Sequence, residues 1–298
     1  MTAESRSAVP EHATLGPRPT DEELDLFGMT HPGKVRPDNQ DQFLVCTVHP
    51  QVLVRWTSLN DLDTLPMRGQ RLATLMLVAD GVGGLAGGAD ASRVATQTVT
   101  RYVSSALRCY HAAGGSVDEH EFLDELRRAA LEAHEVVRAD RARRVGGQGG
   151  ATTLTLGLVI WPWLYVLQVG DSRCYVFGDG RLRQVSRDQT VAQDLVDQGV
   201  LSPAQASASP LSNVLSSAIG ADEAMPVVTH VDVRKRGTVI LVCSDGLTKH
   251  VTDDEIAAHL DAMTSAEHAC RALVELALHR GGSDNITVVV GRALERTR

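Results

Sequence analysis

Apolar residues recur at helical spacing in two segments in the first half of the chain. In residues 91–107, Val99 and Val103 belong to one apolar face, and in residues 117–143 Leu126 belongs to another. A period of three to four residues is typical of an amphipathic helix packed on a core. The pattern therefore predicts two helices here. Two shorter helices are predicted over residues 253–263 and 265–279.

Short apolar runs separated by turn residues predict strands in the rest of the chain. These strands cover residues 43–45, 52–54, 72–79, 152–160, 164–169, 174–177, 182–185, 227–233, 238–243 and 285–290. Trp-Pro, Gly-Asp and Gly-Asp-Gly turns punctuate residues 152–185, as in a meander of antiparallel hairpins. Because strands come in blocks and helices in pairs, we predict an α+β layered sandwich.

The chain is predicted to form one domain preceded by an arm. Residues 1–25 are polar with little periodicity, which predicts a disordered or loosely attached segment. No domain boundary is evident within residues 26–298. Residues 187–220 interrupt the strand pattern with short helical pieces. We expect them to form a flap beside the functional site that contributes to substrate choice.

Composition narrows the class of protein. Hydrophobic content of 43% and charged content of 22% are those of an ordinary globular protein. A net charge of −8 disfavours a nucleic-acid partner. The five cysteines show no CxxC spacing, which favours buried thiols in a reducing compartment. No apolar leader or membrane-length run is present, so we expect a cytoplasmic protein with no membrane segment.

Four short acidic motifs lie beside apolar strand-like runs: Asn39-Gln40-Asp41, Asp80-Gly81, Asp245-Gly246 and Asp284-Asn285. Aspartate is a poor strand residue and is costly to bury. Its repeated placement at strand ends is explained if the carboxylates converge on hard divalent cations, which favour oxygen ligands. The alternative is that each Asp-Gly pair only makes a turn, and for a single pair that is the better explanation.

The candidate chemistry is hydrolysis of a phosphate ester. Asp80, Asp245 and Asp284, with the carbonyl of Gly81, supply enough oxygens for two cations. A metal pair lowers the pKa of a shared water and stabilises both oxygens of an in-line displacement. Arg36 has the planar fork that binds two phosphate oxygens, although a surface salt bridge is the simpler explanation for an isolated arginine.

Six segments resemble, in order, the PPM (type 2C) metal-dependent protein serine/threonine phosphatases, most closely their bacterial branch. They are HPGKVRPDNQD, VADGVGGLAGGADAS, GATTLTLGLV, VGDSRCYVFGDGRLRQVSRD, LVCSDGL and GGSDNITVVV. The resemblance implies a four-layer α-β-β-α sandwich with two antiparallel sheets flanked by helix pairs. It also implies two Mn²⁺ or Mg²⁺ ions and direct attack of a metal-bridging water on phosphoserine or phosphothreonine. The substrates would be phosphorylated proteins, namely the products of bacterial serine/threonine kinases.

The resemblance also implies roles for individual residues. Asp80 would bridge two metals, with the carbonyl of Gly81 as a further ligand. Asp245 and Asp284 would complete one metal site.

Other roles implied by the resemblance lie beside the metal ligands. Arg36 would clamp the phosphate, and Asp41 would orient metal waters from behind the ligands. Asn285 and Asp171 are interpreted as turn-holding residues.

Departures from the family pattern leave alternatives. Val82 stands where many eukaryotic members have a histidine, and Gln189 also replaces a frequent histidine. Residues 144–151 lack the carboxylate that would help bind a third ion, so a third ion is disfavoured. The same absence supports a regulatory pseudophosphatase that binds phosphoproteins without turnover. A hydrolase of small phosphate esters is a further alternative.

Overall fold

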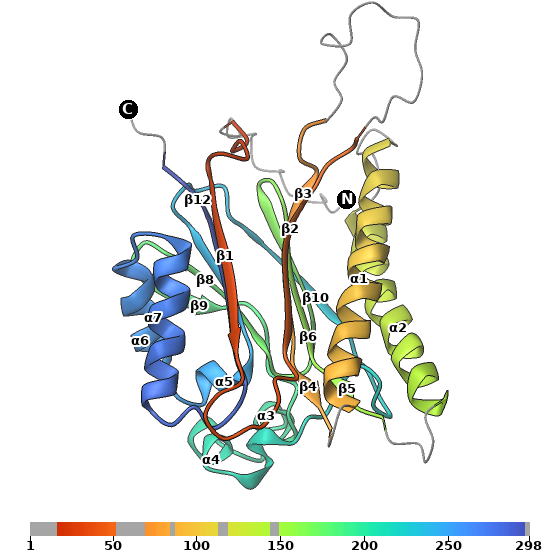
Figure 1. The fold of residues 1–298 in the computed structure, drawn as a ribbon, viewed down its shortest axis with the longest axis vertical. Coiled ribbons are helices and arrows are strands. Elements are labelled where there is room, and N and C mark those ends of the chain that lie inside the picture. The colour runs from red at the N-terminus through yellow and green to blue at the C-terminus, as the bar shows by residue number, and fades with distance from the viewer. Residues whose placement is uncertain (1–16, 52–68, 84–86, 113–118, 144–148, 296–298) are drawn as a thin grey trace, which may run out of the picture.

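A computed structural model describes residues 17–51, 69–83, 87–112, 119–143 and 149–295. Across these residues, two five-stranded antiparallel sheets lie face to face, with helices on both outer sides (Figure 1). The predicted α+β sandwich is confirmed. The predicted strand at residues 52–54 lies outside the described residues.

Each sheet is antiparallel throughout. The first has the order β1 (Leu24–His31), β12 (Ile286–Ala293), β11 (Val239–Cys243), β8 (Arg173–Gly178) and β9 (Arg181–Gln184). The second has the order β10 (Val227–Asp232), β7 (Trp163–Val169), β6 (Leu154–Ile160), β3 (Ala73–Ala79) and β2 (Gln42–Val48). A two-stranded ribbon of β4 (Gly81–Val82) and β5 (Ala151–Thr152) lies at one end.

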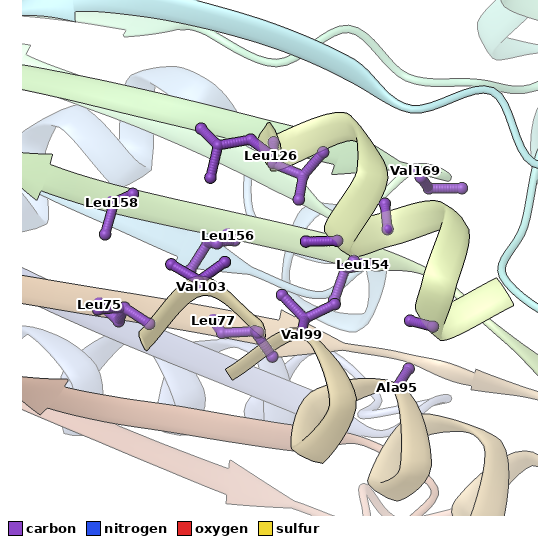
Figure 2. Packing of buried hydrophobic residues seen from close by; sticks show 14 of the residues in the cluster. Leu75, Leu77, Ala95, Val99, Val103, Leu126, Leu154, Leu156, Leu158 and Val169 are labelled. Carbon is purple, nitrogen blue, oxygen red and sulfur yellow. The ribbon is translucent and has the colours of Figure 1, made fainter. Parts of the chain in front are cut away.

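Helix pairs cover the outer face of each sheet. The pair α1 (Gly87–Ala112) and α2 (Glu119–Arg143) covers the second sheet, and α6 (Asp253–Asp261) and α7 (Ala266–His279) cover the first. Figure 2 shows Val99, Val103 and Leu126 packed against the leucines of β3 and β6. The predicted apolar faces of both long helices are therefore the buried ones.

Strand β3 is apolar at every position except Thr74, and its burial explains this pattern. Leu75 and Leu77 belong to the core under α1 and α2, whereas Met76 and Val78 belong to the core between the sheets. Side chains alternate across a strand, so a strand buried on both faces carries no polar stripe. The rigid strand end then positions Asp80.

Strand β1 corrects the predicted arm. It pairs with β12 along its whole length, from Leu24 opposite Ala293 to His31 opposite Ile286. Before it, the guanidinium of Arg18 donates a hydrogen bond to the carbonyl of Leu72, 2.8 Å away. The boundary predicted at residue 25 is therefore too late, because strand pairing already includes residues 24 and 25. Residues 1–16 lie outside the described part of the chain.

The segment predicted as a flap contains short helices: α3 (Val191–Asp197), α4 (Pro203–Ser207) and a 3₁₀ turn at Pro210–Asn213. Ser202 and Gln205 form a capping box that starts α4. Ile219 bridges to Thr152, which ties the end of the segment to β5. In the described part of the chain, no helix has the length and apolarity required to cross a membrane.

Candidate active site

The acidic motifs converge at one end of the two sheets. Asp41 precedes β2, Asp80 follows β3, Asp245 begins the short helix α5 (Asp245–Thr248) after β11, and Asp284 precedes β12. In Figure 1 this is the lower end, where α5, β4 and β5 lie. A cleft of about 1070 Å³ opens there, and its lining includes Arg36, Asp80, Gly81, Asp245 and Asp284. All the predicted site residues except Asp41 line it.

The glycines of two motifs allow backbone segments to touch. A Cβ atom at Gly81 would lie 2.4 Å from the carbonyl oxygen of Gly88 and 2.6 Å from that of Gln40. A Cβ atom at Gly246 would lie 1.9 Å from the carbonyl oxygen of Asn285. These distances leave no room for a side chain. The Asp-Gly pairs therefore bring distant segments together, which the turn explanation alone does not require.

Asp41 is buried behind the cleft. Its Oδ2 accepts hydrogen bonds from the hydroxyls of Ser244 at 2.8 Å and Thr287 at 2.6 Å. Its Oδ1 is buried without a hydrogen-bond partner. Burial raises the pKa of Asp41 to about 6, although the two hydroxyls act in the opposite direction. Asp41 is thus held in place by one oxygen while the other is unsatisfied.

Asp80 is held by its backbone at the end of β3. Its amide donates to Thr153 Oγ1 at 2.9 Å, and its carbonyl accepts from Thr153 N at 2.9 Å and Thr152 Oγ1 at 2.8 Å. Burial raises the pKa of Asp80 well above its ordinary value, and repulsion from Asp41 and Asp245 adds to the shift. The strand end thus fixes a carboxylate with which no cation forms an ion pair in the part of the chain that the structure describes.

Asp171 extends the acidic cluster beyond the predicted ligands. It lies in the turn between β7 and β8, as the sequence indicated, but it also lines the cleft. Burial raises its pKa to about 7, with further contributions from Asp245 and Asp188. The Gly-Asp-Ser sequence indicates a turn, but it does not reveal that this turn faces the cleft.

Asp284 differs from the other carboxylates because two cations bind it. Arg36 donates from Nε to Oδ1 at 2.8 Å and from Nη2 to Oδ2 at 3.0 Å. The ammonium of Lys249 lies 2.9 Å from Asp284 Oδ2 and 2.6 Å from Asp245 Oδ2. Burial raises the pKa of Asp284, but these two hydrogen bonds outweigh burial and hold the pKa below its ordinary value.

Lys249 is the site residue that sequence analysis missed. Its one sequence signal is the four-residue spacing from Asp245, which places the two side chains on the same side of a helical turn. Its contact with Asp284 follows only from the fold.

The donor set fits divalent cations. Asp41 Oδ1 and Asp245 Oδ1 are both buried without a hydrogen-bond partner. Within the described ranges, no three His, Cys, Asp or Glu side chains form a group that could hold one metal ion. The ammonium of Lys249 lies between the carboxylates of Asp245 and Asp284, where a metal ion would otherwise be expected. Unsatisfied carboxylate oxygens, mutual repulsion and an ammonium between two carboxylates are the features expected where a hard cation binds.

Two other predictions concern neighbouring residues. The side chain of Asn285 donates to the carbonyls of Pro32 and Asp38 and accepts from the amide of Gln40, so its predicted turn-holding role is confirmed. Val82 lines the cleft with 44% of its surface exposed.

Comparison with known proteins agrees with this geometry. Residues 63–279 match the family described as Protein phosphatase 2C. The serine/threonine protein phosphatase PstP of Mycobacterium tuberculosis is 35% identical over 227 residues, which are 75% of this chain and 41% of that protein. This chain therefore spans less than half the length of that relative.

Solved structures give the same assignment. The crystal structure of the M. tuberculosis serine/threonine phosphatase PstP/Ppp superposes with a TM-score of 0.71 at 28% identity, covering 91% of this chain and 99% of that one. The catalytic domain of PstP in complex with two manganese ions superposes with a TM-score of 0.68 at 26% identity, covering 91% and 99%. The chain belongs to the protein phosphatase 2C family, in its bacterial branch.

Proposed function

We propose that this protein is a Mn²⁺- or Mg²⁺-dependent protein serine/threonine phosphatase. The observation that carries the proposal is the convergence of Asp80, Asp245 and Asp284 on one cleft together with Arg36. The relative PstP, whose catalytic domain has been solved with two manganese ions, supports both the activity and the metal.

Asp80, the carbonyl of Gly81, Asp245 and Asp284 are the residues we assign to two metal ions. The chemistry that such a pair supplies is activation of a water nucleophile and neutralisation of charge on the phosphoryl oxygens. The third ion stays disfavoured, since Asp140, the carboxylate nearest in sequence to residues 144–151, does not line the cleft.

Arg36 and Asp41 act on either side of these ligands. The guanidinium of Arg36 is exposed at the cleft and has the fork that binds two phosphate oxygens. In this structure that fork is engaged by Asp284, so phosphate binding requires Arg36 to leave that carboxylate. Asp41 lies behind Asp80 and Asp245, with its free Oδ1 available to orient ligands or waters from the rear.

Substrates are proposed to be proteins phosphorylated on serine or threonine by bacterial kinases, in the cytoplasm. The segment predicted as a flap supplies residues 213–218 to the cleft lining. These residues lie where the protein chain around a phosphoserine would pass, which supports their role in substrate choice.

The test is phosphate release from a phosphothreonine peptide with Mn²⁺ and then with excess chelator. We expect turnover only with metal, and a loss of at least about 100-fold in Asp245→Asn. Asp261→Asn is the matched control, because Asp261 is exposed at the end of α6, outside the cleft. Full activity in Asp245→Asn would overturn the proposal.

The same assay separates the two alternatives. Phosphopeptide binding without phosphate release, in folded protein with Mn²⁺ or Mg²⁺, would identify a pseudophosphatase. Faster turnover of nucleotides or sugar phosphates than of phosphopeptides would identify a hydrolase of small esters.

A further inference from the structure

Lys249 occupies the centre of the half of the site formed by Asp245 and Asp284. Its ammonium lies 2.6 Å from Asp245 Oδ2 and 2.9 Å from Asp284 Oδ2, and 29% of its side chain is exposed. It therefore contacts both residues assigned to one metal. No described residue other than Arg36 and Lys249 brings a positive charge to the cleft lining.

The backbone holds these two carboxylates close together whether or not Lys249 is present. Gly246 lies against the carbonyl of Asn285, where even a Cβ atom would come within 1.9 Å. The residues preceding each of these, Asp245 and Asp284, are consequently fixed as neighbours. Two carboxylates in this position repel one another unless a cation lies between them.

The Lys249 side chain is free to leave this position without a change in the fold. Its backbone amide is bonded to the carbonyl of Asp245 at 2.8 Å, which anchors the end of α5 independently of the ammonium. A lysine stem is long and flexible, and its exposed part opens to the cleft. The ammonium thus makes a contact that is electrostatically strong but conformationally replaceable.

We propose that Lys249 is a displaceable counter-ion that competes with the divalent ion for Asp245 and Asp284. This inference rests on the proposed function, because it requires metal at these carboxylates. Lys249 stabilises the metal-free protein and lowers its affinity for metal, since a metal must displace the ammonium. It is a positioning residue that acts through the two carboxylates.

The decisive experiment compares Lys249→Met with Lys235→Met. Methionine keeps a long flexible chain and removes the charge in both variants. Lys235 pairs with Asp179 and precedes β11, at the opposite end of the strand from Asp245, so it controls for the change in net charge. Mn²⁺ binding is measured by calorimetry, and the midpoint of thermal unfolding is measured with chelator and with saturating Mn²⁺.

We expect Lys249→Met to bind Mn²⁺ about tenfold more tightly than the wild type, because no internal cation has to be displaced. Its unfolding midpoint should fall in chelator and return to at least the wild-type value with Mn²⁺. Lys235→Met should leave the Mn²⁺ affinity unchanged. Lys249→Gln provides a second neutral variant should Lys249→Met fail to fold.

Unchanged or weaker Mn²⁺ binding in both neutral variants would overturn the inference. An equal loss of unfolding midpoint with and without Mn²⁺ would show a purely structural role. The proposed function is tested by a different outcome. Wild-type protein that binds Mn²⁺ but releases no phosphate would refute the phosphatase activity, while the competition between Lys249 and Mn²⁺ could still be measured. Wild-type turnover with unchanged affinity in the variants would refute the competition alone.

Discussion

The two halves of the acidic cluster are stabilised in opposite ways. Asp41 and Asp80 come from the β2–β3 side, and no cation forms an ion pair with either among the described residues. Burial raises both of their pKa values, and repulsion from Asp245 contributes to each. Asp245 and Asp284 come from the β11–β12 side and share the ammonium of Lys249.

The difference shows how a fold holds carboxylates that its chemistry requires. A buried carboxylate is tolerated if it takes up a proton or if it is paired with a cation. On one side of the cleft this protein leaves Asp41 and Asp80 without an ion pair and with raised pKa values, and on the other side it pairs Asp245 and Asp284 with a cation. A divalent ion would compensate the charge on both sides. Without metal, replacing a carboxylate on one side should therefore change the stability of the protein in the opposite direction from replacing one on the other side.

Neutralising one carboxylate on each side should therefore have opposite effects on stability. In chelator, Asp80→Asn should raise the free energy of unfolding by about 1–2 kcal/mol, because it removes a carboxylate that is repelled by Asp41 and Asp245. Asp284→Asn should lower the free energy by about 1 kcal/mol, because Arg36 and Lys249 lose a partner. Urea unfolding measures both.

Both variants should also lose at least about 100-fold in metal-dependent turnover. Shared loss of activity with opposite changes in stability is a result that general misfolding does not produce. A destabilised Asp80→Asn protein would contradict the proposed contrast between the two halves.

The sequence predicted the carboxylates of this cluster better than their counter-ion. Asp80, Asp245 and Asp284 are marked by apolar runs that predict strands, and an aspartate at such a strand end is conspicuous. Lys249 has no comparable sequence signal, because a lysine at the end of a short helix is usually solvated. Its second partner, Asp284, is 35 residues away and becomes a neighbour only through the approach of Gly246 to β12.

The fold likewise contains elements that the sequence predicted and one that it did not. The apolar run of β3 and the helical period of α1 and α2 were predictable because burial selects for them locally. Strand β1 was not, because Asp25 interrupts its apolar pattern. That carboxylate accepts hydrogen bonds from Arg292 Nε at 3.0 Å and from the amide of Ala266 at 2.9 Å, two distant partners that make the polar residue acceptable in a strand.

The raised pKa of Asp41 should make the stability of the metal-free protein depend on pH. The pKa of Asp41 is raised from 3.8 to about 6, so its protonated form is favoured in the folded state. Its contribution is present below about pH 4 and is lost as pH rises through 6. Between pH 4.5 and 7.5 in chelator, wild type should lose about 1–2 kcal/mol relative to Asp41→Asn.

Urea unfolding of both proteins at the two pH values measures this difference. Asp261→Asn, with an exposed carboxyl, should follow wild type. Parallel pH dependence of wild type and Asp41→Asn would mean that Asp41 is ionised throughout this range.

The smallest expected effect isolates the hydroxyl that supports Asp41. Ser244→Ala removes one hydrogen bond to Asp41 Oδ2 and the acceptor of the Thr287 amide, and should cost about 1 kcal/mol of stability. It should also weaken Mn²⁺ binding severalfold, because a less constrained Asp41 orients the metal site less well. Ser186→Ala is the matched control: Ser186 Oγ likewise accepts from a buried amide, that of Cys174, but Ser186 does not line the cleft. Its loss should reduce stability while Mn²⁺ affinity stays at the wild-type value. If both variants weaken Mn²⁺ binding equally, Asp41 affects the metal only through global stability, and the β2–β3 half has no separate positioning role.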